Sequence, residues 1–351
     1  MNEMNESPLA SLKPSPWSSP YLRFVLFGLL AASLPLLSGS GLMKSSTLNY
    51  IGNVLVYAVA ALGLNLLLGY AGLISLGTAG FMGLGSYIAA YAVKDMGLSF
   101  WAALTAAVLI PTLIGLLIGL ISLRIEGIYL AIATLCVSEI LLKSFEQADS
   151  ITGGMQGKSV SYPVIFGHTF NRSSTYILLV VALTLVMILT HNFVSGQKGR
   201  ALHAMRGSEV AAQAMGVNLL QYRLIAFSLA TAYAALSGAL YVFFIKFSYP
   251  SVWNLNLSLY VLAAVVIGGL RSIYGTIIGT FVVWAVPDLV LKKLPVVGGI
   301  NGLPYIFNGI LIILVVMFAP QGISGLWQAK FPLKRKKKEK EEAISGKKED
   351  E

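Results

Sequence analysis

Apolar residues form long runs along this chain, and most polar and charged residues lie between the runs. An α-helix needs about 20 mainly apolar residues to cross roughly 30 Å of hydrocarbon, and most of the runs approach that length. The pattern therefore predicts an all-α, polytopic membrane protein with about ten transmembrane helices. The predicted spans are residues 21–38, 48–68, 72–93, 99–122, 127–146, 174–192, 223–246, 256–270, 273–291 and 303–319.

Composition supports the membrane class and divides the chain into three parts. The 351 residues are 56% hydrophobic and 11% charged, whereas a soluble domain carries roughly 25% charged residues. Residues 1–20 form an N-terminal segment, 21–327 the membrane domain and 328–351 a tail of mixed charge without apolar runs, which we predict to be disordered. The first apolar run imitates a signal peptide, but no A-x-A site follows it, so we count it as a span.

The charges orient the predicted helices. An even number of spans puts both termini on one side, and a cytoplasmic basic tail then places 17 of the 25 Lys and Arg residues inside and eight outside. The positive-inside rule therefore favours cytoplasmic termini, although the split is even without the tail. In this topology the loop 195–222 is cytoplasmic and the loop 147–173 is external.

The external loop contains Gly157-Lys158-Ser159, which resembles the end of a nucleotide-binding P-loop. A P-loop also needs a glycine where Thr152 stands, and it must join a strand to a helix. Neither condition is met here. We predict instead a turn-rich external loop, in which Gly153, Gly154 and Gly157 permit close approach of the backbone to another group.

The cytoplasmic loop predicts one amphipathic helix from Arg200 to Met215 that ends at Gly216. Such a helix fits a groove on a cytoplasmic partner, and the alternative is a helix lying on lipid headgroups. An apolar stripe is formed by Leu202, Met205, Val210 and Ala214.

Two glycine-dense segments, 69–86 and 268–279, interrupt predicted spans, one in each half of the chain. Broken helices of this kind mark substrate paths in transporters, whereas the alternative is close helix packing through small residues. Glu139 is the clearest ionisable residue inside a span and could contact a substrate ammonium or amide, although an i, i+4 pair with Lys143 would also explain it. The candidate substrate path is Asn65, Gly77, Thr134, Glu139, Gly268 and Gly269.

Catalytic and metal-binding groups have no suitable arrangement in the sequence. His168, His191 and His203 fall in different loops or span ends, and one cysteine excludes a disulfide framework. We predict neither an enzyme nor a bound cofactor.

Six segments in chain order carry a resemblance to a known family. They are GLNLLLGYAGLISLGTAGFMGLGSYIAAY, LRIEGIYLAIATLCVSEI, ITGGMQG, GRALHAMRGSEVAAQAMGVN, VVIGGLRSIYGTIIGT and FAPQGISGL. Together they resemble the motifs of branched-chain amino acid ABC importer permeases, specifically the LivM-type subunit. The resemblance covers about residues 48–327.

The resemblance implies a permease of the prokaryotic cytoplasmic membrane with several partners: a LivH-type sister permease, two cytoplasmic ATPase subunits that bind the ATP, and an extracytoplasmic solute-binding protein. It also implies that residues 209–216 form the segment that docks on the ATPase. The external loop with Thr152, Gly153 and Gly154 would lie on the side met by the binding protein. The coupling residues would be Arg200, Arg206, Glu209, Ala211, Ala212 and Gly216.

Other functions stay open at this point. The solute could be urea or a short amide rather than an amino acid, because the external loop has Met155-Gln156 where relatives often have proline or acidic residues. An ion-coupled secondary transporter or an intramembrane enzyme would belong to different classes. The coupling-type loop argues against the first and the scattered histidines against the second.

Overall fold

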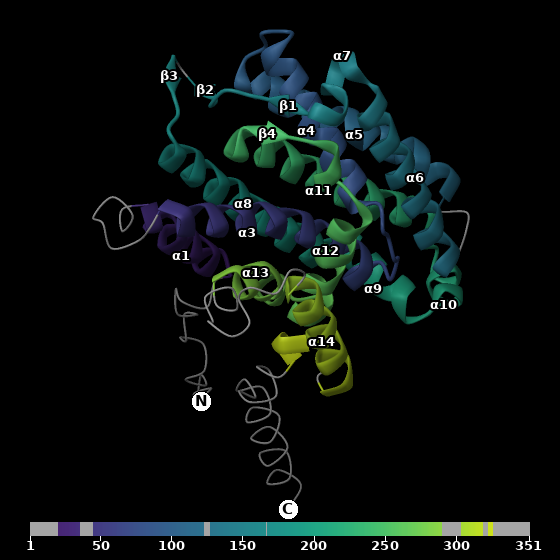
Figure 1. Ribbon diagram of the computed structural model, residues 1–351. Coiled ribbons are helices and arrows are strands. Elements are labelled where there is room, and N and C mark those ends of the chain that lie inside the picture. Colours follow the sequence, from purple (N-terminus) through teal and green to yellow (C-terminus); the bar gives the residue numbers. More distant parts are fainter. Residues whose placement is uncertain are drawn as a thin grey trace, which may run out of the picture.

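The computed structural model describes residues 20–35, 45–122, 127–165, 167–289, 303–318 and 322–325 (Figure 1). The N-terminal segment, the charged tail and the start of the LRIEG segment lie outside these described residues. The helices are α1 (Pro20–Ala32), α3 (Ser45–Leu64), η2 (Asn65–Tyr70, a π-helix), α4 (Thr78–Lys94), α5 (Phe100–Ser122), α6 (Ile128–Gln147), α7 (Asp149–Thr152), η3 (Gly154–Gln156), α8 (Arg172–Ser195), α9 (Gln197–Gly207), α10 (Glu209–Ala214), α11 (Leu219–Ile245), η4 (Pro250–Val252), α12 (Leu255–Gly268), α13 (Ile273–Leu289) and α14 (Leu303–Phe318).

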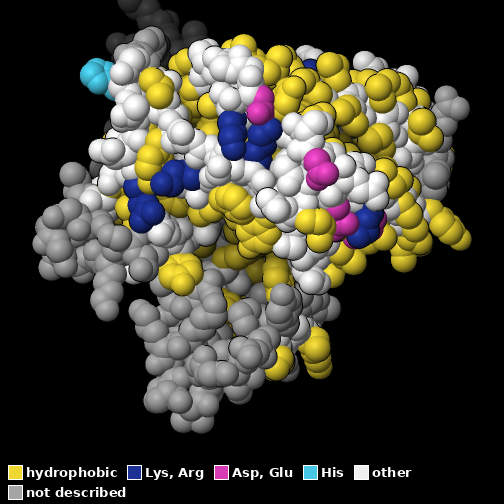
Figure 2. Space-filling view, turned by 45° about the horizontal axis from the view of Figure 1, so that its top comes forward, with side chains coloured by type: hydrophobic (Ala, Val, Ile, Leu, Met, Phe, Trp, Pro, Cys, Tyr) yellow, Lys and Arg dark blue, Asp and Glu magenta, His cyan; other side chains and the backbone are white. Residues whose placement is uncertain are grey.

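Six of the described helical segments are long and apolar enough to cross a membrane. Two shorter apolar helices, Pro20–Ala32 and Ile273–Pro287, accompany them. Each of the ten predicted apolar runs overlaps a helix of the described chain, although the run 72–93 is helical only from Thr78, and the count of ten crossings stays a prediction. The class of polytopic helical membrane protein is therefore confirmed. Figure 2 shows one face of the molecule, on which hydrophobic side chains cover wide areas and charged side chains gather at a few points.

The centre of the bundle consists of α3 and α11. Helix α11 packs against α3, α4 and α5, while α3 also contacts α8, α12 and α13. Most of both helices is buried, whereas α5, α6 and α8 expose large apolar side chains. Because hydrocarbon solvates apolar side chains well, helices in a membrane associate through close backbone packing of small residues.

Glycines allow this close approach between α4 and α11. A side chain at Gly85 would overlap the backbone of Ala235, and one at Gly238 would overlap the carbonyl of Met82. The alternative of small-residue packing therefore accounts for the part of segment 69–86 that lies in α4. Gly275 and Gly279 of α13 likewise pack on the backbone of α12.

The chain leaves the helical path at two places, as the glycine-dense segments predicted. Helix α3 widens into η2 and the chain is then non-helical over residues 71–77, before α4 begins at Thr78. The second break, residues 269–272, separates α12 from α13. Within the two glycine-dense segments only these short stretches are non-helical, since Gly80, Gly83, Gly85, Gly275 and Gly279 lie within α4 and α13.

The loop 147–173 is more structured than the sequence suggested. Strand β1 (Lys158–Ser159) pairs antiparallel with β4 (Phe247–Ser248), and β2 (Val164–Ile165) pairs with β3 (His168–Thr169). Lys158 is buried, donates to the Ile151 carbonyl at 2.7 Å and forms an ion pair with Asp95. The lysine of the GKS sequence therefore ties this loop to the end of α4.

The loop 147–173 and the α9–α10 pair lie at opposite ends of the bundle. Helices α8 and α11 are 24 and 27 residues long and run between these ends (Figure 1). We call the end of the bundle that carries the loop 147–173 the loop end, and the opposite end the α9–α10 end.

The contact between α4 and α11 makes a prediction about stability. Gly238→Val should lower the free energy of unfolding by about 1–3 kcal/mol, because the added side chain forces the two backbones apart. The measurement is the thermal midpoint of the purified protein in detergent. Gly309→Val in α14 is the matched control, since no atom lies within 4 Å of a Cβ at that position. Equal midpoints for the two variants would contradict the packing argument.

Candidate functional site

Asn65 joins the two helix breaks. It is the first residue of η2 and is 2% exposed. Its Nδ2 donates to Thr276 Oγ1 at 2.7 Å and to the Ser272 carbonyl at 3.2 Å, while its Oδ1 accepts from the Arg271 N–H at 3.0 Å. Both donor hydrogens of the amide are therefore used within the protein, and in this conformation Asn65 acts as a connector between the breaks.

The second break has an unusual backbone. Gly269 has φ +104°, a conformation that side chains rarely adopt, and Arg271 has φ +65°. The Tyr70 hydroxyl donates to the Arg271 carbonyl at 2.6 Å. Asn65 and Tyr70 thus hold the N–H and the carbonyl of Arg271 from the π-helix side. Gly268 lies nearby, in backbone contact with Gly275.

Thr134 and Gly77 meet at the start of α4, where three hydroxyl oxygens accept from the chain. Thr134 Oγ1 accepts from the Leu76 N–H, Ser138 Oγ from Gly80 and Ser258 Oγ from Ala79, each at 3.0 Å. A helix that begins inside the molecule leaves its first N–H groups without backbone partners, and these hydroxyls satisfy several of them.

Sequence reasoning identified Thr134 but missed Ser138 and Ser258. Ser138 lies four residues after Thr134, so a pair of hydroxyls on one face of a membrane helix was a usable signal. Ser258 could not be found in this way, because it lies 179 residues from its partner Ala79.

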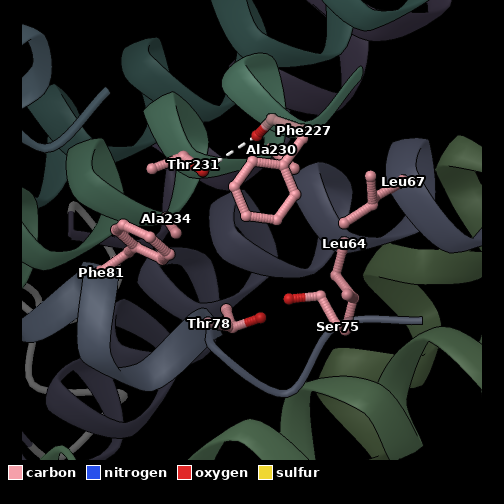
Figure 3. Close-up of a pocket in the computed structure, with 9 residues that line it drawn as sticks. All are labelled: Leu64, Leu67, Ser75, Thr78, Phe81, Phe227, Ala230, Thr231 and Ala234. Carbon is pink, nitrogen blue, oxygen red and sulfur yellow. Dashed lines mark hydrogen bonds between the residues drawn. The ribbon is translucent and has the colours of Figure 1, made fainter. Parts of the chain in front are cut away.

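A small cavity lies beside this start of α4 (Figure 3). Its polar lining is the hydroxyls of Ser75, Thr78 and Thr231, and the close-up shows Ser75 and Thr78 turned toward each other. The space suits about one water molecule, so it is too small for an amino acid in this conformation. The remaining lining is apolar: Leu64, Leu67, Phe81, Phe227, Ala230 and Ala234.

Glu139 lies apart from these residues. It lines an open hollow on the outer face of α6 together with Ile140, Lys143, Ser144 and Gln147. Lys143 pairs with Glu146 at 2.7 Å, so the ion pair of Lys143 is made with Glu146 rather than with Glu139. The structure joins Asn65 to the 269–272 break, which begins beside Gly268, and it brings Gly77 to Thr134, but it brings Glu139 to neither group.

The α9–α10 pair corrects the prediction of a single helix. Ser208 adopts an extended backbone between the two helices, and its side chain accepts from the Ala211 N–H at 3.3 Å as the N-cap of α10. Leu202 and Met205 of α9 are buried, but Val210 and Met215 are exposed by 79% and 84%. The prediction of one continuous apolar stripe is therefore wrong, because the break at Ser208 turns the α9 half and the α10 half in different directions.

The end of α10 agrees with the prediction at Gly216. This glycine has φ +83°, its N–H donates to the Gln213 carbonyl, and the next N–H donates to the Ala212 carbonyl. This hydrogen-bond pattern is the Schellman motif that ends many helices. At the other end of α10, Glu209 pairs with Arg223 of α11 at 2.6 Å.

The remaining predicted coupling residues differ in exposure. Arg200 is exposed and donates to the Ser195 carbonyl at 3.3 Å, Ala211 is exposed, and Ala212 is buried. Arg206 turns into the molecule and donates to the carbonyls of Leu68 and Gly69.

At the loop end, Thr152 is buried and its hydroxyl donates to the Phe145 carbonyl at 2.7 Å. Gly153 and Gly154 adopt left-handed conformations that carry the chain around it. The strongly exposed apolar residues of this stretch are Ile151 and Met155, so the surface is formed by the neighbours of the predicted residues.

His203 of α9 also contacts the π-helix. Its ring lies edge-on to the Tyr70 ring at 5.3 Å. Partial burial, followed by the charges of Arg271 and Arg206, lowers the pKa of His203 below its ordinary value of 6.5. His203 therefore stays neutral to a lower pH than an ordinary histidine does.

Apolar helices with two internal breaks, together with a short capped helix exposed at one end of the bundle, are typical of a membrane transport protein. Residues 46–316 match the family described as the permease component of the branched-chain amino acid transport system. The chain belongs to this permease family.

Individual relatives cover most of the chain. The high-affinity branched-chain amino acid permease protein LivM of Escherichia coli (strain K12) is 29% identical over 87% of this chain and 75% of its own length. LivM of Salmonella typhimurium is 30% identical with the same coverage. A probable LivH permease protein of Methanocaldococcus jannaschii is 29% identical over 69% of this chain and 80% of its own length. No solved structure matches the chain.

The lowered pKa of His203 predicts a pH dependence of stability. Below about pH 6.5 the unfolded chain takes up a proton at this residue more readily than the folded protein, so folding stability should decline as the pH falls through this window. Thermal midpoints between pH 5 and 8 measure it, and His203→Gln should remove part of the decline. His168→Gln, in the exposed strand β3, is the control. Identical pH profiles for wild type and His203→Gln would contradict the prediction.

Proposed function

We propose that this protein is a permease subunit of an ABC importer that takes up branched-chain or other small neutral amino acids. The observation that carries the proposal is α10, a short helix capped at both ends that exposes Val210 and Met215 in a chain of this family. Large apolar side chains exposed on a short helix outside the apolar bundle favour a protein partner. On this proposal the chain is not an enzyme, and ATP is bound and hydrolysed by separate subunits.

The proposed topology has ten crossings of the prokaryotic cytoplasmic membrane, with both termini and α9–α10 on the cytoplasmic side. Support comes from the excess of Lys and Arg on that side and from the helices that overlap every predicted run. The shorter helices α1, α4, α13 and α14 would complete the crossings beside the six long ones.

Two ATPase subunits are the proposed cytoplasmic partners, one for this chain and one for a LivH-type sister permease. Helix α10 would insert Val210 and Met215 into a groove of the ATPase. The ion pair between Glu209 and Arg223 fixes α10 to α11, so a push on α10 is passed into the bundle.

The α10 surface makes the first test of this function. Met215→Glu should cost more than about 1 kcal/mol of binding free energy, because a charge would enter the apolar centre of the interface. The measurement is recovery of ATPase subunits with the tagged permease, followed by ATP-dependent uptake. Met96→Glu is the matched control, because Met96 is an exposed methionine just beyond the C-terminal end of α4. Full recovery with Met215→Glu would refute docking through α10.

The sister permease is proposed to cover the outer face of α6. An ionisable side chain at membrane depth is costly unless it faces protein or a water-filled path. Glu139 lies on that face, within a helix long and apolar enough to span. A second permease packed there would give Glu139 a polar surrounding and create a path between the two subunits.

Transport would follow alternating access. A loaded solute-binding protein docks at the loop end beside Ile151 and Met155, and closure of the ATPase pair moves α9–α10. The solute is a zwitterion: Glu139 suits its ammonium, and the N-terminus of α4, with its positive dipole end, suits its carboxylate once the hydroxyls of α6 and α12 release it. Because Glu139 lies apart from the start of α4, the two groups would act at different points along the path.

Glu139→Gln tests the role of the carboxylate. Removing the charge should raise the solute concentration needed for half-maximal uptake by about tenfold, since one ion pair to the ammonium is lost. ATP-dependent uptake in proteoliposomes with the partner subunits measures it. Glu146→Gln, on the same helix and paired with Lys143, is the control. Unchanged uptake and apparent affinity for Glu139→Gln would exclude this role.

A further inference from the structure

Arg206 connects the α9–α10 end to the first helix break. Its guanidinium donates to the Leu68 carbonyl at 3.0 Å and to the Gly69 carbonyl beside it. Both carbonyls belong to the last turn of η2, where a helix leaves its acceptors without backbone partners. A positive charge there also meets the negative end of the helix dipole. Arg206 thus caps a helix that precedes it by more than 130 residues.

Further contacts fix α9 against the same turn. The His203 ring meets Tyr70 edge-on, and the aliphatic stem of Arg206 lies 3.7 Å from a Cβ built on Gly72. The last turn of η2 and the start of the 71–77 break are therefore both in contact with α9.

The same turn also holds the second break. The Tyr70 hydroxyl donates to the Arg271 carbonyl, and Asn65 Oδ1 accepts from the Arg271 N–H. The strained Arg271 backbone is therefore bound on both sides. Gly69 lies between them, because a Cβ there would overlap Asn65 Oδ1 and lie 2.9 Å from the Arg271 nitrogen. A movement of η2 would break these hydrogen bonds unless the 269–272 break moved with it.

The π-helix is the element able to change. A π-helix holds one more residue per hydrogen-bonded turn than an α-helix and occurs frequently at functional sites. Pulling or releasing the Leu68 and Gly69 carbonyls shifts the balance between the wide and the regular turn. Arg206 is the side chain of α9 that binds these carbonyls in the described structure.

We infer that Arg206 is a positioning residue that transmits the movement of α9–α10 to both helix breaks, through η2 and the Arg271 peptide. The inference rests on the proposed function, because it assigns the route by which ATPase closure reaches the transport path. It also distinguishes Arg206, which acts inward, from α10, which acts on the partner.

The first experiment compares Arg206→Gln with Lys198→Gln, which removes an exposed positive charge from the same helix. The complex is reconstituted in proteoliposomes with its ATPase, sister permease and loaded binding protein. Arg206→Gln should leave recovery of the complex and ATP hydrolysis near wild type and lower solute moved per ATP by about tenfold, a usual strength of coupling between linked sites. Lys198→Gln should keep the wild-type ratio.

Arg206→Lys tests whether coupling depends on the positive charge that caps η2 or only on the packing of the side chain. A lysine ammonium can donate to the same carbonyls, though without the planar fork, so it should restore part of the ratio. An unchanged ratio in Arg206→Gln overturns the inference. Loss of complex assembly in both variants also overturns it, because Arg206 would then be needed only for folding. A wild-type complex that hydrolyses ATP without moving amino acid refutes the proposed function, and the inference falls with it.

A second measurement does not depend on the solute. Ser272→Cys in a Cys136→Ala background places one thiol in the second break, and its maleimide labelling rate is compared without nucleotide and with ATP plus vanadate. The rate should change with nucleotide in the parent and in Lys198→Gln, but not in Arg206→Gln. A nucleotide response retained in Arg206→Gln, or absent from the parent, contradicts the proposed route.

Discussion

Backbone groups at a helix break need partners wherever water is absent, and the centre of this protein is built around that requirement. At the first break the N–H groups of Leu76, Ala79 and Gly80 donate to side-chain hydroxyls of α6 and α12, those of Thr134, Ser258 and Ser138. At the second break the Arg271 peptide binds Asn65 and Tyr70. Irregular backbone at membrane depth persists only with such partners. The breaks are therefore held by side chains of other helices, and a movement of those helices changes the breaks.

The two cytoplasmic helices of the proposed topology have different tasks because their polar and apolar groups face opposite ways. Helix α9 buries Leu202 and Met205 and turns Arg206 onto backbone carbonyls, so it belongs to the bundle. Helix α10 exposes Val210 and Met215 and contacts the bundle through the Glu209 ion pair. On the proposed function α10 would bind the ATPase and α9 would pass the movement to the transport domain, with Ser208 as the turn between the two helices.

Several features were predictable because they depend on local physics. Hydropathy located the helices, since each must cover its backbone with apolar side chains over a fixed length. Gly216 ended its helix as expected, because a left-handed residue suits glycine. The single helix over 200–215 was wrong although a local signal existed: Ser208 followed by Glu209 is a common start of a helix. The helical spacing of apolar residues across Ser208 favoured one continuous helix over a second helix beginning at Glu209.

The sequence by itself determined the class of protein, the approximate position of the helices, the two breaks and the family, because each of these follows from local composition or from an ordered set of motifs. Only the tertiary structure decided which polar groups satisfy the breaks. Asn65 and Ser272 are 207 residues apart, and Arg206 and Leu68 are 138 apart. No local rule relates residues at such separations, since their contact depends on how the helices pack around α3 and α11.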